Sequence, residues 1–209
     1  MRDSDAGGQP RLERAFTAAF GRSPPAPVDV GRKRLVYSPH LLVQLGHEWA
    51  LVSRGDNSDD CLACSGAVSI HYLRERADRF EALRGWLEAV PGSAMGRASD
   101  RLTATHVLSS FPVLASEASS IGQGYICGGL HLLELRPEGP RSWGYVPTLY
   151  DDTGVGREGR GRRVTGRIAN IVRSRSFDVV YSGDVTARQR YVIRSGKAVP
   201  LGGSRQPRC

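Results

Sequence analysis

Arginine is the residue type with the clearest chemical potential in this sequence, and it is concentrated in the C-terminal third. From Gly154 to Cys209 there are thirteen Lys and Arg residues and three acidic residues, whereas the first 153 residues hold sixteen and eighteen. Guanidinium groups bind phosphates, sulfates and carboxylates through paired hydrogen bonds. The net charge of +8 therefore predicts an anionic partner that meets the C-terminal third.

Two arginine pairs provide candidate residues for that partner. Arg173 and Arg175, and likewise Arg188 and Arg190, are two positions apart, which puts both members of a pair on one face of a strand. Together with Arg194 they form the predicted site for an envelope polymer or an acidic protein. The competing interpretation is an arginine-rich surface that has no partner. Nucleic acid is disfavoured, because the sequence has no helix-turn-helix and no aromatic-plus-basic RNA signature.

Side-chain oxygens are densest between residues 56 and 60. The alternating Asp56, Ser58 and Asp60 could direct three oxygens at one calcium ion. The turning glycine and the bidentate glutamate of a calcium loop are missing, so a solvated turn is the alternative. Asp151 and Asp152 begin a shorter loop of the same kind. Calcium is the one cofactor that the sequence suggests.

The four cysteines, Cys61, Cys64, Cys127 and Cys209, allow two disulfide bonds in any of three pairings. A β-rich run follows the CxxC motif, and this disfavours a redox site, which needs a helix there. Cys127 and Cys209 are isolated, which disfavours a zinc site. Structural disulfides in a periplasmic or secreted protein are favoured over reduced, buried cysteines in the cytosol. The first 34 residues contain no apolar segment typical of a signal peptide, and no run of about 18 apolar residues would span a membrane.

No pattern in the sequence demands an enzyme. The five histidines lack metal-ligand spacing, and GxSxG is absent. The GxGxxG match at residues 154–159 precedes arginines and a predicted strand instead of a helix, so it indicates a flexible basic loop. Two alternatives stay open: a small hydrolase of an envelope polymer with acids from residues 56–60 or 151–152, and an intracellular nucleic-acid-binding protein.

Short strands must position these residues, because β-branched and aromatic residues with partial period-two alternation recur between turn signals. One short helix is expected from Pro10 to the proline-rich connector at Pro24, with Leu12, Phe16 and Phe20 on its apolar face. The segment 79–90 has good helix formers, yet a strand is expected there because it would complete a unit. Strands are expected at residues 34–38, 41–45, 48–53, 67–75, 79–90, 102–108, 113–116, 129–135, 142–147, 165–172, 177–182, 190–193 and 198–201.

Part of the sequence repeats at an offset of 63 residues. Residues 50–53 and 64–68 align with residues 113–116 and 127–131, and a looser copy begins at Phe177. Repeats of this length are typical of propeller blades or β-meanders. We therefore expect an all-β, mainly antiparallel fold of three related units, propeller-like or sandwich-like. An N-terminal arm of residues 1–30 would precede a single β domain, residues 31–209, made of units 31–98, 99–160 and 161–209.

Two stretches also carry a family resemblance. One is the strand, acidic loop, CxAC, glycine and strand at residues 51–73. The other is the sequence GQGY at residues 122–125, with residues 130–135 and the loop 151–154. Over these segments, about half of the chain, the protein resembles a loosely defined group of exported bacterial β-repeat proteins without known activity. The resemblance implies a β repeat and export. The sequence as a whole predicts an exported, non-catalytic binding or accessory protein.

Overall fold

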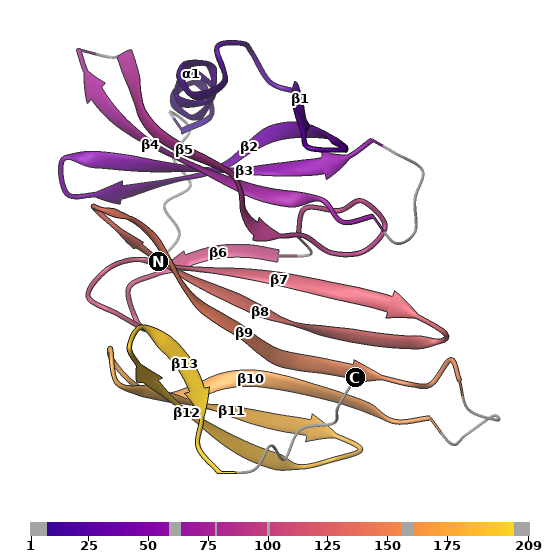
Figure 1. Cartoon of the computed structure of the whole chain (residues 1–209). Helices are drawn as coiled ribbons and strands as arrows, with labels where there is room; N and C mark the ends of the chain where they lie inside the picture. Colours follow the sequence, from indigo (N-terminus) through magenta and orange to yellow (C-terminus); the bar gives the residue numbers. More distant parts are fainter. Residues whose placement is uncertain (1–7, 59–63, 78, 100, 156–160, 203–209) are drawn as a thin grey trace. The chain divides into compact units, whose positions relative to one another are not determined.

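The computed structural model describes residues 8–58, 64–77, 79–99, 101–155 and 161–202 of the 209-residue chain. The chain divides into two compact units, Met1–Ser99 and Asp100–Cys209. Each unit has its own antiparallel sheet and its own apolar core (Figure 1). The prediction of a mainly antiparallel β fold with one short N-terminal helix is confirmed.

The first unit is a five-stranded sheet on which one helix packs. The predicted apolar face of the helix makes this contact: Phe16 is fully buried, and Leu12 and Phe20 are partly buried against Leu51 and Leu73 of the sheet. Burial of this stripe stabilises a helix that is too short to form alone in water. The elements, in sheet order after the helix, are α1 (Gly8–Phe20), β1 (Ala26–Val30), β2 (Lys33–Leu45), β3 (Glu48–Asn57), β4 (Ala67–Arg76) and β5 (Arg79–Pro91).

Two differences from the expected strands occur at prolines. The connector after Pro24 continues into β1, which pairs along β2 although it contains Pro27. Because β1 is an edge strand, the nitrogen of Pro27, which has no hydrogen to donate, can face the side that has no neighbouring strand. The two strands expected at residues 34–38 and 41–45 are the single strand β2, whose register shifts between Pro39 and Leu41. A bulge thus accommodates the proline where the sequence suggested a break.

The ambiguous segment at residues 79–90 is a strand, as expected, and its alternative as a helix is wrong. Gly85, in the middle of this strand, lies directly opposite His71 of β4. A Cβ atom at this glycine would lie 2.5 Å from Cδ2 of His71. The glycine therefore makes room for a buried imidazole ring.

The second unit is an eight-stranded sheet that curls around its core. Trp143, Phe177, Tyr181 and Tyr191 are buried together on its inner side. The turn after Arg194 reaches back to the ninth strand, where Arg141 Nη2 donates to the carbonyl oxygen of Ser195 at 2.6 Å. The strands pair in chain order: β6 (Arg101–Thr105), β7 (Val113–Gly122), β8 (Tyr125–Arg136), β9 (Gly139–Asp151), β10 (Arg163–Val172), β11 (Ser176–Gly183), β12 (Ala187–Arg194) and β13 (Lys197–Pro200).

The strands form three successive four-stranded meanders, β2–β5, β6–β9 and β10–β13. The aligned segments that contain Ala50, Val113 and Asp178 lie on the second strand of each meander, β3, β7 and β11. The second and third meanders share the sheet of the second unit, where β9 meets β10. In the described part of the chain this seam has three residue pairs, at residues 149–151 and 163–165. Beyond them, Tyr181 Oη donates to the Pro147 carbonyl oxygen at 2.9 Å.

Candidate functional site

The predicted cationic site maps to one face of the third meander. In β12, Arg188, Arg190 and Arg194 are exposed, whereas Gln189 and Tyr191 between them are buried. Alternation along a strand places the three arginines on the same face. The two-residue spacing therefore places Arg188 and Arg190 on one face of the strand, as predicted.

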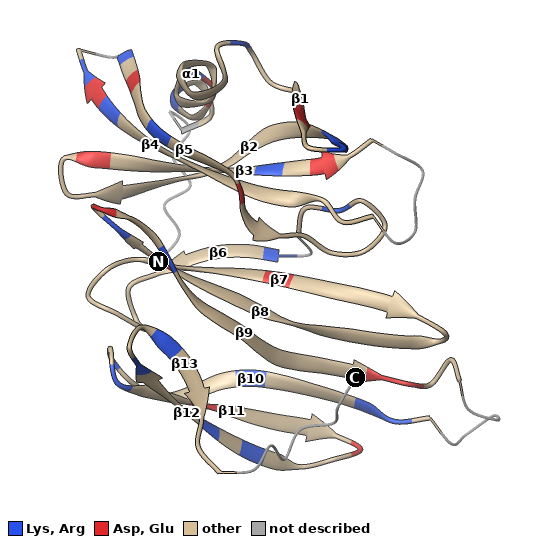
Figure 2. Cartoon of the chain, viewed as in Figure 1, with Lys and Arg blue, Asp and Glu red and all other residues tan. Residues whose placement is uncertain are grey.

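Neighbouring strands add two cations that the sequence analysis did not include. Arg167 of β10 pairs with Val180 of β11, which in turn pairs with Arg188. Lys197 of β13 lies directly opposite Arg194. Residues paired across strands share a face of the sheet. Figure 2 shows Lys and Arg in β10, β12 and β13. We call the five cations on this face of the sheet the basic face: Arg167, Arg188, Arg190, Arg194 and Lys197.

A sequence signal exists in retrospect for Lys197 but not for Arg167. Ser195-Gly196 is a two-residue hairpin turn with φ of 50° and 71°, a conformation that a Gly-containing dipeptide favours. This turn makes Arg194 and Lys197 cross-strand partners. Arg167 lies on the same face as Arg188 because of the register between β10, β11 and β12. The sequence of one strand does not specify that register.

A buried carboxylate anchors the basic face. Asp178 is 1% exposed, and its Oδ2 accepts hydrogen bonds from Arg188 Nε at 2.8 Å and Asn170 Nδ2 at 3.0 Å. Arg188 Nη2 donates to the same oxygen. Burial would raise the pKa of Asp178, but the hydrogen bonds from Arg188 and Asn170 outweigh it and lower that pKa. The carboxylate is therefore ionised at neutral pH and fixes Arg188.

The other cations of the basic face are less constrained. Arg190 donates from Nη2 to Ser176 Oγ at 3.1 Å. Among the described residues, Arg188 is the only member of the basic face within 4.0 Å of a carboxylate oxygen. Arg194 and Lys197 are thus like charges directly opposite each other, an arrangement that destabilises a sheet unless an anion compensates it.

Arg173 and Arg175 do not belong to the basic face. Both lie in the turn between β10 and β11, so the strand argument made from their spacing is wrong for this pair. Arg173 Nε donates to the Ser109 carbonyl oxygen at 2.9 Å, and Ser174 N donates to the Leu108 carbonyl oxygen at 2.8 Å. These contacts tie the turn to the loop before β7. Arg173 is therefore a structural residue in this fold.

The predicted calcium residues have other contacts. Asp56 Oδ1 accepts a hydrogen bond from the Ala98 backbone N–H at 2.7 Å. Ser58 Oγ donates to the Arg34 carbonyl oxygen at 3.2 Å. Asp60 lies outside the described residues, within which no group of three His, Cys, Asp or Glu side chains could hold a metal ion. The calcium site stays a prediction that these contacts do not favour.

The Asp151–Asp152 loop is also held by internal bonds. Asp151 Oδ1 accepts hydrogen bonds from the hydroxyl and the backbone N–H of Thr153, and these lower its pKa. Asp152 accepts from the backbone N–H of Arg162 and from Tyr150 Oη, and its pKa is lowered by the same contacts. A general acid needs a raised pKa. Asp151 and Asp152 therefore fit a structural role in this turn better than the role of general acid in the hydrolase alternative.

Two of the four cysteines can be placed. Cys127 packs against the core of the second unit. Neither Cys64 nor Cys127 is a free thiol. Cys61 and Cys209 lie outside the described residues, so the pairing of the cysteines stays a prediction.

Comparisons with protein-family models, with curated proteins and with solved structures found no match. The resemblance to exported bacterial β-repeat proteins therefore stays a prediction. Within the described ranges, no helix has the length and apolar character needed to cross a bilayer. The case for a function rests on the geometry of the basic face.

Proposed function

We propose that this protein is an exported, non-catalytic binding protein that recognises an anionic polymer through the basic face. One observation carries the proposal: Arg194 and Lys197 oppose each other across β12 and β13 without a described acid within 4.0 Å. Charged groups of a bound polymer would remove this repulsion and gain paired hydrogen bonds from the arginines. An acidic protein offers the same carboxylate chemistry and is the second partner of this class.

The dimensions of the basic face favour an extended ligand. Arg188 and Arg190 are about 7 Å apart along β12, and the neighbouring strands are about 5 Å apart. Side chains on this face, among the residues described in β10–β13, include no aromatic ring, and the apolar members are Ala169, Val172, Val180, Val192 and Val199. Proteins that bind single-stranded nucleic acid stack bases on aromatic rings. The face therefore favours a polymer of phosphate, sulfate or carboxylate groups over nucleic acid.

Polyanion binding tests this proposal. The probes are sodium polyphosphate, dextran sulfate, poly-L-glutamate and single-stranded DNA, each titrated at several salt concentrations. We expect Arg190→Glu/Arg194→Glu/Lys197→Glu to weaken binding of at least one non-nucleic-acid probe more than tenfold. Each neutralised charge of a single-stranded nucleic acid contributes roughly 0.7 to the slope of log K against log salt concentration, so by analogy the slope should fall by about 2.

A charge-matched control separates this effect from net charge. Arg22→Glu/Arg32→Glu/Arg34→Glu makes the same change in charge at three exposed positions of the first unit. We expect its affinity to stay within threefold of the unmodified protein. Equal losses in both triple variants, or no binding of any probe at low salt, would overturn the proposal. Binding of DNA alone would support the nucleic-acid alternative instead.

A further inference from the structure

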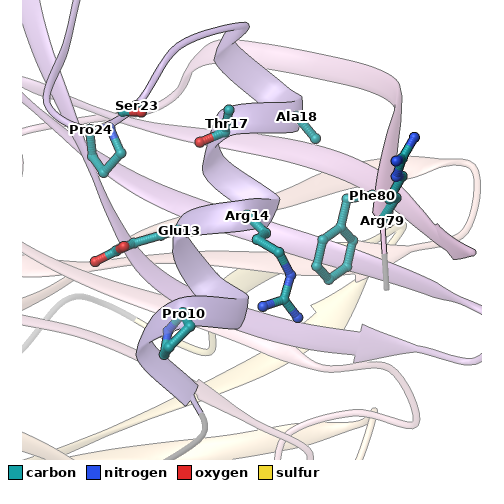
Figure 3. A pocket seen from close by; sticks show the side chains of 9 residues that line it. All are labelled: Pro10, Glu13, Arg14, Thr17, Ala18, Ser23, Pro24, Arg79 and Phe80. Atoms are coloured by element: carbon teal, nitrogen blue, oxygen red, sulfur yellow. The ribbon is translucent and has the colours of Figure 1, made fainter. Parts of the chain in front are cut away.

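The first unit has a pocket of 710 Å³ on the outer side of α1. Its walls are the exposed face of the helix, the connector that follows the helix, and the start of β5. Its size is within the range of small-molecule sites, about 300 to 1,000 Å³. The lining residues, drawn in Figure 3, are Pro10, Glu13, Arg14, Thr17, Ala18, Ser23, Pro24, Arg79 and Phe80.

Two cations and an aromatic ring come together on one flank of this pocket. In Figure 3, Arg14 extends from the helix toward the ring of Phe80, and Arg79 lies on the other side of that ring. Phe80 is partly buried because it packs against the core of the first unit, so its position is fixed by the fold. Pro10, Ala18 and Pro24 add apolar surface to the lining.

Neither arginine has a carboxylate partner among the described residues. Glu75, whose pKa Arg14 helps to lower, accepts hydrogen bonds from Arg11 at 3.1 and 2.6 Å. Glu13 accepts from Gln9 and lies on the opposite flank of the helix in Figure 3. The flank around Phe80 therefore combines an apolar surface with two arginines that have no carboxylate oxygen within 4.0 Å among the described residues.

We propose that this pocket binds a small organic anion with a flat apolar body, such as an aryl carboxylate or sulfonate. The apolar body would lie on Phe80 and Ala18, and the anionic group would interact with Arg14 and Arg79. A cation that faces an apolar surface interacts more strongly with an anion there than in water, because the local dielectric is lower. The proposal concerns the first unit and does not depend on the basic face.

A matched pair of fluorescent probes tests it. 8-Anilinonaphthalene-1-sulfonate carries the anionic group, and N-phenyl-1-naphthylamine has the same ring system without it. We expect Arg14→Gln/Arg79→Gln to weaken binding of the sulfonate at least tenfold and to change binding of the neutral probe less than twofold. Thr17→Trp, which places a large side chain in the pocket, should abolish binding of both probes.

A control variant assigns the site. Arg32→Gln/Arg34→Gln removes two exposed charges from the same unit outside the pocket. It should bind the sulfonate within twofold of the unmodified protein. The inference is overturned if the pocket variants leave sulfonate binding unchanged, or if this control causes an equal loss. Circular dichroism of each variant checks that the fold is retained.

Discussion

Asp178 is the residue on which the basic face depends most directly. Its buried carboxylate accepts hydrogen bonds from Arg188 and Asn170. We expect Asp178→Asn to lower the free energy of unfolding by about 2 kcal/mol at pH 7, because hydrogen bonds to a charged group are lost. Urea denaturation measures this change. Asp184→Asn, at an exposed acid of the same unit, is the control and should change stability less.

The effect of Asp178 also depends on pH. Its pKa in the folded protein lies below the ordinary value of 3.8, so its contribution is complete at neutral pH. As the pH falls below 3.8 toward the folded pKa, the contribution is lost. The stability difference between the unmodified protein and Asp178→Asn should therefore narrow below about pH 4. A difference that stays constant down to pH 2 would contradict this assignment.

His71 also makes the protein less stable in acid, but over a higher range of pH than Asp178. Burial lowers its pKa from 6.5 to about 4, and its Nδ1 has no hydrogen-bond partner among the residues that the structure describes. The unfolded chain takes up a proton below pH 6.5, whereas the folded chain does not until about pH 4. Stability should therefore fall by about 3 kcal/mol between these values. We expect His71→Leu to remove this part of the pH dependence, as measured by urea denaturation from pH 7 to pH 4.

Two glycines in strands provide a steric test. An added Cβ at Gly85 would lie 2.5 Å from the ring of His71, whereas one at Gly122 would meet no atom within 4 Å. Gly85→Ala should cost about 1 to 3 kcal/mol of stability because it overpacks this site. Gly122→Ala should stay within about 0.5 kcal/mol. Thermal denaturation of both variants would show the contrast, and equal effects would contradict the described packing around His71.

At the scale of elements, Arg11 adds two kinds of polar contact to the apolar packing of α1 on its sheet. Arg11 forms an ion pair with Glu75 at 2.6 Å, and its guanidinium lies 4.0 Å from the ring centroid of Trp49. We expect Arg11→Ala to cost about 1 kcal/mol, since both contacts are partly exposed. Amide hydrogen exchange should become faster across residues 8–20. Arg22→Ala, at an exposed position, should leave the exchange unchanged.

Local patterns in the sequence were sufficient to predict most elements. The apolar face of α1, the strand at 79–90 and the second strand of each meander follow from periodicity and from the repeat. β1 was missed because its stabilisation comes from pairing with β2, and a proline-rich segment shows no sign of that partner. Pro39 suggested a break in β2 because a bulge depends on the neighbouring strand.

The candidate site was predicted in part for a similar reason. Arg188, Arg190 and Arg194 could be assigned from spacing within one strand. Arg167 and Lys197 joined them through the register between strands. Arg173 and Arg175 have the same spacing as Arg188 and Arg190 but lie in a turn. Spacing therefore predicts a shared face only where the limits of the strand are known.

At the scale of the whole molecule, the state of the cysteines tests the proposed export. We expect all four to be oxidised, so that alkylation of the denatured, unreduced protein adds no mass in an intact-mass measurement. Disulfides restrict the unfolded chain, so reduction should also lower the melting temperature. Four alkylated thiols would contradict the disulfides and export, and would favour the intracellular nucleic-acid alternative.

The seam between β9 and β10 has a mechanical consequence for the proposed binding. In the described part, three residue pairs join these strands, compared with eleven between β8 and β9. This is the smallest number of described residue pairs between neighbouring strands of the eight-stranded sheet, and the Arg141–Ser195 hydrogen bond crosses the seam. Every residue of the basic face lies on strands β10 to β13. We therefore expect small rotations at this seam to move β10–β13 as one body. The basic face would adapt in this way to an irregular polymer while the distances between its charges stay the same.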